Sequence, residues 1–236
     1  MEVIRETGDV DPQLLAERFA ANFDPLRGYG TRIPGVMERI KEGLPWQEVG
    51  TDSFGNGGAM RVAPVGFFYF DNMQKLKEAA VLSCRVTHHH PLGVAGAVAQ
   101  AVAVSMAVSL GLRRAEIIPD IFISTVASMV SNISGEFSDR LQTIPLESSG
   151  DFSADRERIT FFFGCDVTAL ESVPAAIACF LLTNSLRDAI VMGVNLGGDT
   201  DTIGAMAGAI AGAYYGLKAV PVEWLEGLEN VGRGRD

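Results

Sequence analysis

An uncharged stretch of 21 residues, running from Leu92 to Leu112, constrains the fold of this chain more than any other feature. A segment of that length could cross a lipid bilayer. It consists mostly of Ala, Val, Gly and Ser, with Gln100 near its middle and no aromatic belt at its ends, which is unlike a typical membrane span. A helix that is apolar on all sides can instead be buried inside a large helical domain. We therefore expect a core helix and no membrane partner.

The spacing of apolar residues, which recur at steps of three and four along most of the chain, favours helices over strands. We expect a shaped loop in the glycine-rich segment 49–58 and irregular chain in the polar segment 134–159. No repeat and no Pro/Ser-rich linker divides the chain, so the prediction is one all-α domain over residues 1–236. The predicted helices are one between Asp11-Pro12 and Asp24-Pro25, and others over 33–42, 59–70, 73–84, 93–112, 117–133, 170–182, 185–193 and 202–220.

The chain is acidic, with 19 Lys and Arg against 29 Asp and Glu and a net charge of −10. Such a surface repels polyanions, so we expect no nucleic acid among its partners. A phosphate-bearing ligand would have to be attracted by something other than net charge. The three cysteines are widely spaced and lie in apolar surroundings, which indicates reduced thiols and a cytoplasmic protein.

The sharpest local signal is the segment Asn195 to Gly216, NLGGDTDTIGAMAGAIAGAYYG, whose helical part carries a glycine at every fourth residue. A neighbouring helix can approach closely on such a face. Acids and hydroxyls in Asp199-Thr-Asp-Thr202 have two interpretations, of which the first is a helix cap. The second places Asp199 in the preceding glycine turn and Asp201 at the cap, so that both carboxylates hold a hard cation such as Mg²⁺. The residues alone leave both open.

A second signal is the glycine-rich segment Ser53-Phe-Gly-Asn-Gly-Gly-Ala-Met-Arg61, which leads into an apolar helix. Glycines let backbone N–H groups approach a ligand, and a helix N-terminus attracts anions, so a phosphate or diphosphate could bind here. Neither the dinucleotide fingerprint nor the P-loop spacing is present. An ordinary tight turn is the competing interpretation.

All three histidines lie together in Thr87-His-His-His-Pro91, directly before the uncharged segment. Adjacent side chains cannot all face one ion, and the nearest thiol, Cys84, would complete only part of a zinc site. We therefore favour a helix cap, or a hydrogen bond from one imidazole to a ligand, over a zinc centre.

Together these segments resemble the ADP-ribosylglycohydrolase family, and especially its branch of serine-linked ADP-ribosyl-acceptor hydrolases. The resemblance implies a compact orthogonal multi-helix bundle with two Mg²⁺ ions, which hold the ribose hydroxyls of ADP-ribose and position water against the anomeric carbon. Metal cations and backbone N–H groups would then hold the anionic ligand on an acidic protein. The matching pieces, in the family's order, are Arg27-Gly-Tyr-Gly30, Ser53 to Arg61, Thr87-His88 with Pro91-Leu-Gly93, Glu171-Ser-Val-Pro174, and Leu196 to Gly216.

The resemblance also assigns roles to single residues. Asp199, Asp201 and Thr202 correspond to metal ligands, and the two aspartates are the candidate catalytic residues. His88 falls where the family places a phosphate contact, and Val167 where it places an apolar residue beside the adenine. In the serine-linked branch a Tyr stands at the position of Phe54, so the ring is kept and the hydroxyl lost. The remaining candidate ligand-binding residues, which correspond to the family's diphosphate loop, are Ser53, Phe54, Gly55, Asn56, Gly57, Gly58 and Met60.

One departure concerns the start of the chain. The family carries an N-terminal Thr-Asp-Asp-Thr metal motif and an acidic catalytic residue upstream of it, whereas Met1 to Glu6 reads like the interior of the helix that follows. The resemblance thus implies an N-terminally incomplete domain, for which we expect weak Mg²⁺ binding, negligible turnover and self-association. The implied function is Mg²⁺-dependent hydrolysis of the glycosidic bond between ADP-ribose and a modified protein side chain or related conjugate. The alternative is a non-catalytic ADP-ribose-binding or structural protein of the same fold.

Overall fold

The computed structural model describes residues 1–228, in which every regular element is a helix. The only β-type pairings in that range are two isolated bridges, Thr51 with His88 and Gly55 with Thr168. The all-α class predicted from the periodicity is confirmed.

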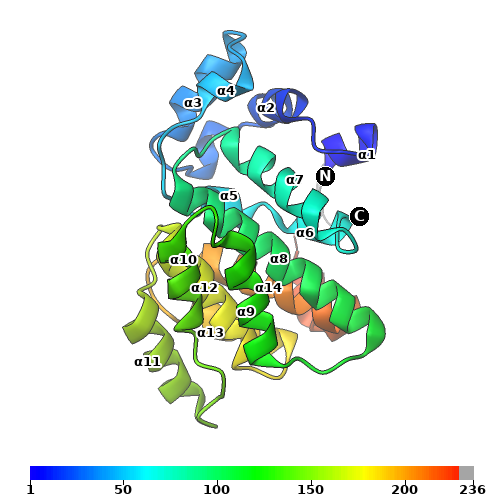
Figure 1. Ribbon diagram of the computed structural model, residues 1–236, viewed down its shortest axis with the longest axis vertical. Coiled ribbons are helices and arrows are strands. Elements are labelled where there is room, and N and C mark those ends of the chain that lie inside the picture. Colours follow the sequence, from blue (N-terminus) through cyan, green and yellow to red (C-terminus); the bar gives the residue numbers. More distant parts are fainter. Residues whose placement is uncertain (229–236) are drawn as a thin grey trace.

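The uncharged segment forms the central helix, α8 (Pro91–Arg113), which packs against α12 (Ala169–Leu181) and α14 (Thr200–Tyr215) (Figure 1). Residues 93–105 of α8 are all buried, and the Gln100 amide donates a hydrogen bond to the Met206 carbonyl of α14 over 2.9 Å. The helix is long and apolar enough to cross a bilayer, but the rest of the chain buries 83% of its most apolar window. Burial on all sides is what a core helix requires.

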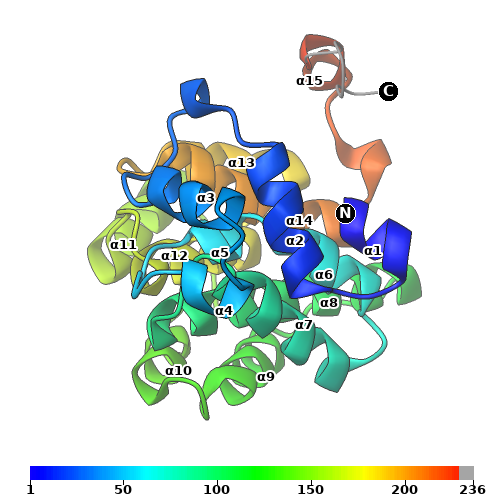
Figure 2. The ribbon, with the colours of Figure 1, turned by 90° about the horizontal axis from the view of Figure 1, so that it is seen from above.

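The glycine face of α14 lies against α13 (Leu186–Val194). A Cβ atom added at Gly204 would lie 2.6 Å from the Val194 side chain, and one at Gly208 would lie 3.0 Å from Ile190. The predicted close approach of a neighbouring helix is therefore confirmed. The helix begins at Thr200 and ends at Tyr215, and its C-cap residue Gly216 has a φ of +79°, so the predicted extension to residue 220 is wrong. The short η2 (Leu217–Ala219) and α15 (Val222–Gly227) follow, and α15 stands apart from the main body (Figure 2).

The polar segment 134–159 was expected to be irregular, and this prediction is wrong. Its helices begin at polar caps, because the Ser134 hydroxyl accepts a hydrogen bond from the Phe137 N–H and the Asp151 carboxylate accepts from two N–H groups. Phe137 and Ile159 are among the residues that bury an apolar face against the core. Charged residues on the exposed faces concealed this pattern. The outer helices are α9 (Pro119–Val130), α10 (Gly135–Gln142) and α11 (Phe152–Phe163).

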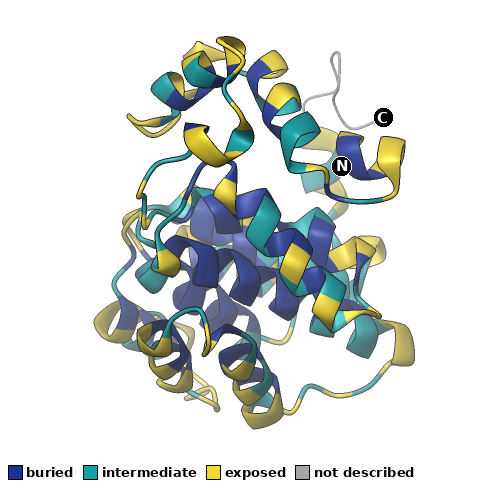
Figure 3. Cartoon of the chain, turned by 45° about the horizontal axis from the view of Figure 1, so that its top comes forward, coloured by how far each residue is buried: buried dark blue, intermediate teal, exposed yellow. Residues whose placement is uncertain are grey.

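Residues of the N-terminal helices between 16 and 49 form, together with Val86, a small separate core at one end of the molecule, whereas Ile4 packs into the main core (Figure 1). Their buried residues include Ala16, Val36 and Met37. Figure 3 shows this layer as more exposed than the central helices. The helices predicted after Asp11 and over 33–42 are confirmed, whereas the single-domain prediction stays a prediction. The elements are α1 (Glu2–Thr7), α2 (Pro12–Ala21), η1 (Pro25–Arg27), α3 (Ile33–Lys41) and α4 (Trp46–Val49).

The predicted helix 59–70 is in fact two short helices, α5 (Gly57–Met60) and α6 (Ala63–Phe68), followed by α7 (Met73–Arg85). Pro64 lies in the first turn of α6. It lacks the N–H that would continue the hydrogen bonds of α5, and its ring favours a helix start. The break turns the chain directly after the glycine-rich segment and leaves residues 50–56 as the loop.

Candidate functional site

The glycine-rich loop is held by backbone hydrogen bonds on both sides. On one side the Thr51 N–H donates to the Thr87 carbonyl over 3.1 Å, and the His89 N–H donates back to the Thr51 carbonyl over 2.8 Å. These bonds tie the loop to the chain between α7 and α8. The loop is therefore fixed to the start of the central helix.

On its other side the loop is bound to the start of α12. The Asn56 N–H donates to the Val167 carbonyl over 2.9 Å, and the Ala169 N–H donates to the Phe54 carbonyl over 3.0 Å. Two extended segments that lie more than 100 residues apart in the chain thus pair with each other, and the bridge between Gly55 and Thr168 is part of this pairing. This pairing brings Phe54 and Val167 onto the same part of the molecule.

Close packing explains why the loop contains glycine at 57 and 58. A Cβ atom at Gly57 would lie 2.8 Å from Cε1 and 3.0 Å from Nε2 of His88, and one at Gly58 would collide with the Cys84 sulfur. Neither glycine has a positive φ. What Gly57 requires is therefore space rather than a left-handed backbone.

His88 lies buried beneath this loop, with its Nδ1 2.6 Å from the Thr87 hydroxyl. Burial lowers the pKa of the His88 imidazole to about 3, and the neighbouring Arg61, His89 and Arg32 add to the effect. The ring is therefore neutral at physiological pH. It can donate or accept hydrogen bonds there without carrying charge.

The neighbouring histidine, His90, caps the central helix. Its Nδ1 accepts a hydrogen bond from the Leu92 N–H over 3.2 Å. In residues 1–228 no group of three or more His, Cys, Asp and Glu side chains is gathered in a way that could hold a metal. The predicted helix cap is confirmed for His90.

Arg61 lies partly buried next to the loop, with its Nε atom fully buried. Its guanidinium donates to the Gly57 carbonyl over 2.6 Å, to the Ser83 carbonyl over 3.0 Å and to the Thr87 hydroxyl over 2.7 Å. It also lies over the Phe19 ring, with Cζ 4.9 Å from the ring centre. Burial lowers the pKa of Arg61 from its ordinary value, but arginine keeps its charge in proteins. The loop therefore has a fixed cation below it.

The aspartate motif follows a turn that only glycine tolerates. Gly197 and Gly198 have φ values of +90° and +67°, and a Cβ atom at Gly198 would collide with the Cys165 carbonyl. The Asp199 N–H donates to that carbonyl over 2.7 Å. Asp199 occupies the N-cap position of α14, yet its side chain makes no capping hydrogen bond. Its carboxylate is therefore not used to cap the helix.

Asn56 joins the glycine loop to the aspartate turn. Its buried amide donates to Oδ2 of Asp199 over 2.6 Å and to the Ser172 hydroxyl over 3.1 Å. A hydrogen bond to a carboxylate is shorter and stronger than one between neutral groups. Two segments 143 residues apart in the chain thus meet at one side-chain contact.

The other two residues of the motif lie in the first turn of α14. Asp201 is exposed and Thr202 is buried. The metal interpretation had placed Asp201 at the cap, and that placement is wrong, because Asp199 is the N-cap residue and Asp201 is the second residue of the helix. Both carboxylates and the hydroxyl nevertheless belong to one turn of chain and are all oxygen donors, the type that Mg²⁺ prefers.

The remaining predicted ligand-binding residues lie on the outside of the loop. Phe54, Met60 and Val167 are 48%, 50% and 56% exposed, which is high for large apolar side chains. The Phe54 ring meets the His90 ring edge-on, with centroids 5.8 Å apart. The Ser53 hydroxyl accepts a hydrogen bond from the Gly55 N–H over 3.3 Å. Phe54 and Val167 thus offer adjacent apolar surface to a ring-shaped group.

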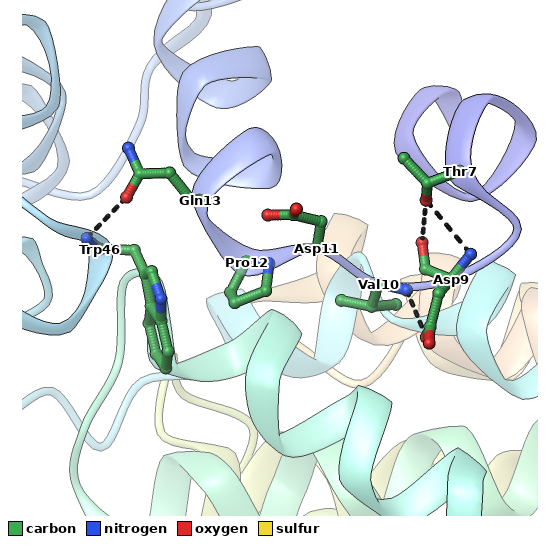
Figure 4. A pocket seen from close by; sticks show the side chains of 7 residues that line it. All are labelled: Thr7, Asp9, Val10, Asp11, Pro12, Gln13 and Trp46. Carbon is green, nitrogen blue, oxygen red and sulfur yellow. Dashed lines mark hydrogen bonds between the residues drawn. The ribbon is translucent and has the colours of Figure 1, made fainter.

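Two hollows of the described surface lie outside the set of predicted site residues. One, of about 450 Å³, is lined by Thr7, Asp9, Val10, Asp11, Pro12, Gln13 and Trp46 (Figure 4). There the Gln13 side chain accepts a hydrogen bond from the Trp46 N–H over 3.1 Å. Another, of about 510 Å³, lies between α11 and the residues before the aspartate turn. Neither contains a predicted site residue.

Comparison with known proteins identifies the family. The family model described as ADP-ribosylglycohydrolase matches residues 1–236. The chain belongs to the ADP-ribosylglycohydrolase family. ADP-ribosylhydrolase ARH3 of Homo sapiens is 35% identical over 252 residues, which cover 91% of this chain and 68% of that protein. The Gallus gallus ARH3 is 36% identical over 264 residues, covering 95% of this chain and 69% of that protein.

A solved structure described as an ADP-ribosylglycohydrolase-related protein complex matches this fold with a TM-score of 0.72 and 24% sequence identity. The match covers 97% of this chain and 72% of that one. The resemblance to the family and to its ARH3 branch is therefore confirmed, together with the helical fold that it implied.

Three polar residues of this candidate site were not singled out from the sequence. Ser172 accepts from Asn56, Thr87 contacts His88, and Arg61 binds both the loop and Thr87. Arg61 did carry a signal, because it is the one charged residue in an otherwise apolar run from 57 to 70. Ser172 and Thr87 carried none, since hydroxyls are common at helix starts and ends.

Proposed function

We propose that this chain binds ADP-ribose conjugates at the glycine loop and the aspartate turn, and that with Mg²⁺ it hydrolyses the bond between ADP-ribose and its acceptor. One observation carries the proposal: the Asn56 amide joins the loop to Asp199, 143 residues away. A diphosphate site and a cation site that adjoin are what a nucleotide sugar needs. Membership of the family supports the same substrate class.

The loop supplies the groups that an anionic diphosphate requires. The backbone N–H groups of Gly57 and Gly58 lie at the start of α5, and His88 packs against Gly57. The Arg61 guanidinium donates a hydrogen bond to the Gly57 carbonyl. Buried positive charge and N–H groups attract phosphate even on a protein of net charge −10. The exposed pair Phe54 and Val167 would contact the adenine ring by apolar packing.

The residues of the aspartate turn fit Mg²⁺. The Asp199 carboxylate is free of capping, and neither it nor Asp201 forms an ion pair within the described part of the chain. Asp199, Asp201 and Thr202 would hold the ion through hard oxygen donors. When bound, Mg²⁺ supplies positive charge that orients the ribose hydroxyls and activates a water molecule.

The protein's own contribution to the reaction is positioning. Asn56 holds one oxygen of Asp199, which fixes the direction in which the other can point. The loop hydrogen bonds to α12 hold the diphosphate side of the ligand at a set distance from that carboxylate. A fixed placement of the ribose relative to the acids would lower the barrier, because less orientational freedom is lost in the transition state.

Binding of ADP-ribose without turnover is the second candidate function. It is favoured by one observation, namely that residues 1–228 contain no gathered group of three or more metal-binding acids, histidines and cysteines. Mg²⁺ needs several well-placed oxygen ligands, so two aspartates and a threonine would form only part of a coordination shell.

The test is an assay of ADP-ribose release from a serine-ADP-ribosylated peptide, in MgCl₂ and in EDTA, with ADP-ribose binding measured in parallel. Release in MgCl₂ that is lost in EDTA and in Asp201→Asn supports the hydrolase. Binding of ADP-ribose without its release from the peptide in MgCl₂ supports the second candidate. The absence of both release and binding from a folded protein would overturn both.

A further inference from the structure

The Arg61 guanidinium is a partly buried cation for which the described residues supply no counter-ion. It makes no ion pair within residues 1–228, and its Nε has no hydrogen-bond partner there. Its hydrogen bonds go only to two carbonyls and the Thr87 hydroxyl. Buried charges in proteins are usually paired. This arrangement therefore favours an anion on the other side of the loop.

The contact with Arg61 limits the acceptors to which the Thr87 hydroxyl can donate its hydrogen bond. Arginine only donates hydrogen bonds, so the Thr87 oxygen is the acceptor in that contact. The hydroxyl has one proton and two neighbours, the Cys84 carbonyl at 3.4 Å and Nδ1 of His88 at 2.6 Å. The Cys84 carbonyl already accepts from the N–H groups of Thr87 and His88, at 3.0 and 2.9 Å. The proton is therefore directed to Nδ1.

This hydrogen bond determines the tautomer of His88. If Nδ1 accepts a hydrogen bond, the proton of a neutral imidazole is on Nε2. Nε2 is the ring nitrogen that faces the loop, since Cβ atoms added at Gly57 and Gly55 would lie 3.0 and 3.7 Å from it. The contact at Nδ1 is the one hydrogen bond that the ring makes among the described residues. An Nε2–H donor is thus left for a ligand.

We propose that Arg61 and Thr87 are positioning residues, which hold His88 as the Nε2–H tautomer so that it donates a hydrogen bond to a phosphoryl oxygen of the bound ligand. The proposal rests on the proposed function for the identity of that ligand. Arg61 supplies positive charge below the loop. The neutral His88 imidazole supplies a hydrogen bond in one fixed direction. Burial, and then the nearby Arg61, His89 and Arg32, lower the pKa of the His88 imidazole to about 3 and so oppose a second proton on it. The donor therefore persists across neutral pH.

The first test is the protonation pattern of the imidazole in the free protein. Two-bond ¹H–¹⁵N correlation spectra distinguish a protonated from an unprotonated ring nitrogen, and loss of one set of signals in His88→Gln assigns His88 among the three histidines. We expect Nε2 protonated and Nδ1 unprotonated from pH 6 to pH 8. A protonated Nδ1 in the wild-type protein would overturn the proposal without any ligand being present.

The second test changes the hydroxyl that sets the tautomer. Thr87→Val keeps the shape of the side chain and removes its hydroxyl proton. We expect a shifted Nδ1 signal of His88 and a loss of affinity for ADP-ribose of about tenfold. Thr87→Ser keeps the hydroxyl and should show the wild-type Nδ1 signal and affinity. Thr183→Val is the matched control, because the Thr183 hydroxyl donates only to the Cys179 and Phe180 carbonyls of the preceding helix, α12. An unchanged His88 spectrum and affinity in Thr87→Val would contradict the proposal.

The two hypotheses fail in different ways. If the wild-type protein shows the expected tautomer but His88→Gln binds ADP-ribose as well as wild type does, the donor role is wrong. If the folded wild-type protein binds no ADP-ribose at all, the proposed function fails, while the spectra still decide the tautomer. If Thr87→Val does not fold, the wild-type spectrum and the affinity of Thr87→Ser still decide between the outcomes.

Discussion

Gly57→Ala adds a single methyl group at the closest approach between the glycine loop and His88. The new Cβ would lie 2.8 Å from Cε1 and 3.0 Å from Nε2 of the ring, distances at which one side must move. The ring is buried and its Nδ1 is bound to Thr87, so we expect the loop and the ring to shift together. Ligand contacts made by both should then weaken.

The size of the effect follows from two opposed terms. Overpacking a tightly packed site costs about 1–3 kcal/mol. Alanine is a better helix former than glycine by about 1 kcal/mol in a helix interior, and less at the first residue of a helix as short as α5. We therefore expect a net loss of about 1–2 kcal/mol in the free energy of unfolding. Each kcal/mol lost should lower Tm by about 2–4 °C in a chain of this length.

Chemical denaturation gives the stability, and calorimetric titration of ADP-ribose gives the affinity, which we expect to fall at least tenfold. The matched control is Gly135→Ala at the start of α10, where an added Cβ meets nothing within 4 Å. That variant should be as stable as wild type or more so, with unchanged affinity. If Gly57→Ala behaves like Gly135→Ala in both measurements, His88 is not packed against the loop and the reasoning is wrong.

Three further predictions follow from the site. Asp201→Asn should weaken Mg²⁺ binding and any turnover while leaving the helical circular dichroism intact, because Asp201 is exposed on the first turn of α14; loss of the fold with metal affinity retained would show a capping role instead. Asn56→Leu should lower the free energy of unfolding by about 2 kcal/mol or more, since it removes the donor to the Asp199 carboxylate, and a denaturation midpoint equal to that of wild type would contradict this. His88 should make stability depend on pH: the unfolded imidazole takes up a proton near pH 6.5 and the folded one only near pH 3, so stability is full above about pH 6.5 and falls by at most about 1.4 kcal/mol per pH unit below it. His88→Gln should flatten that slope, and identical slopes for the two proteins would refute the assignment.

The helical fold could be predicted because its strongest elements have patterns that local physics explains. The uncharged run that became α8 and the glycine-spaced run that became α14 both indicate buried helices without further information. The helices within segment 134–159 were not predicted, because charged residues outnumber the buried apolar ones there. The tertiary packing of Phe137 and Ile159 shows which face is buried. The break at Pro64 could have been predicted from the proline itself.

The candidate site was predictable in its parts and not in its connections. Each motif was visible in the sequence, and family resemblance assigned roles that the residues alone left open. The contact between Asn56 and Asp199 spans 143 residues, and no local pattern specifies a pairing of that range. The network of Arg61, Thr87 and His88 likewise depends on how α5 and the end of α7 meet.

The most direct test of the central claim is a calorimetric titration of ADP-ribose into the wild-type protein in MgCl₂ and in EDTA, repeated with Gly57→Ala and with Asp199→Asn. The account predicts one saturable site, with affinity lowered by EDTA and by each substitution, because the glycine loop and the aspartate turn bind two parts of one ligand. Binding that responds to Gly57→Ala but not to Asp199→Asn or EDTA would contradict a shared site, and a folded wild-type protein that binds no ADP-ribose would contradict the account as a whole.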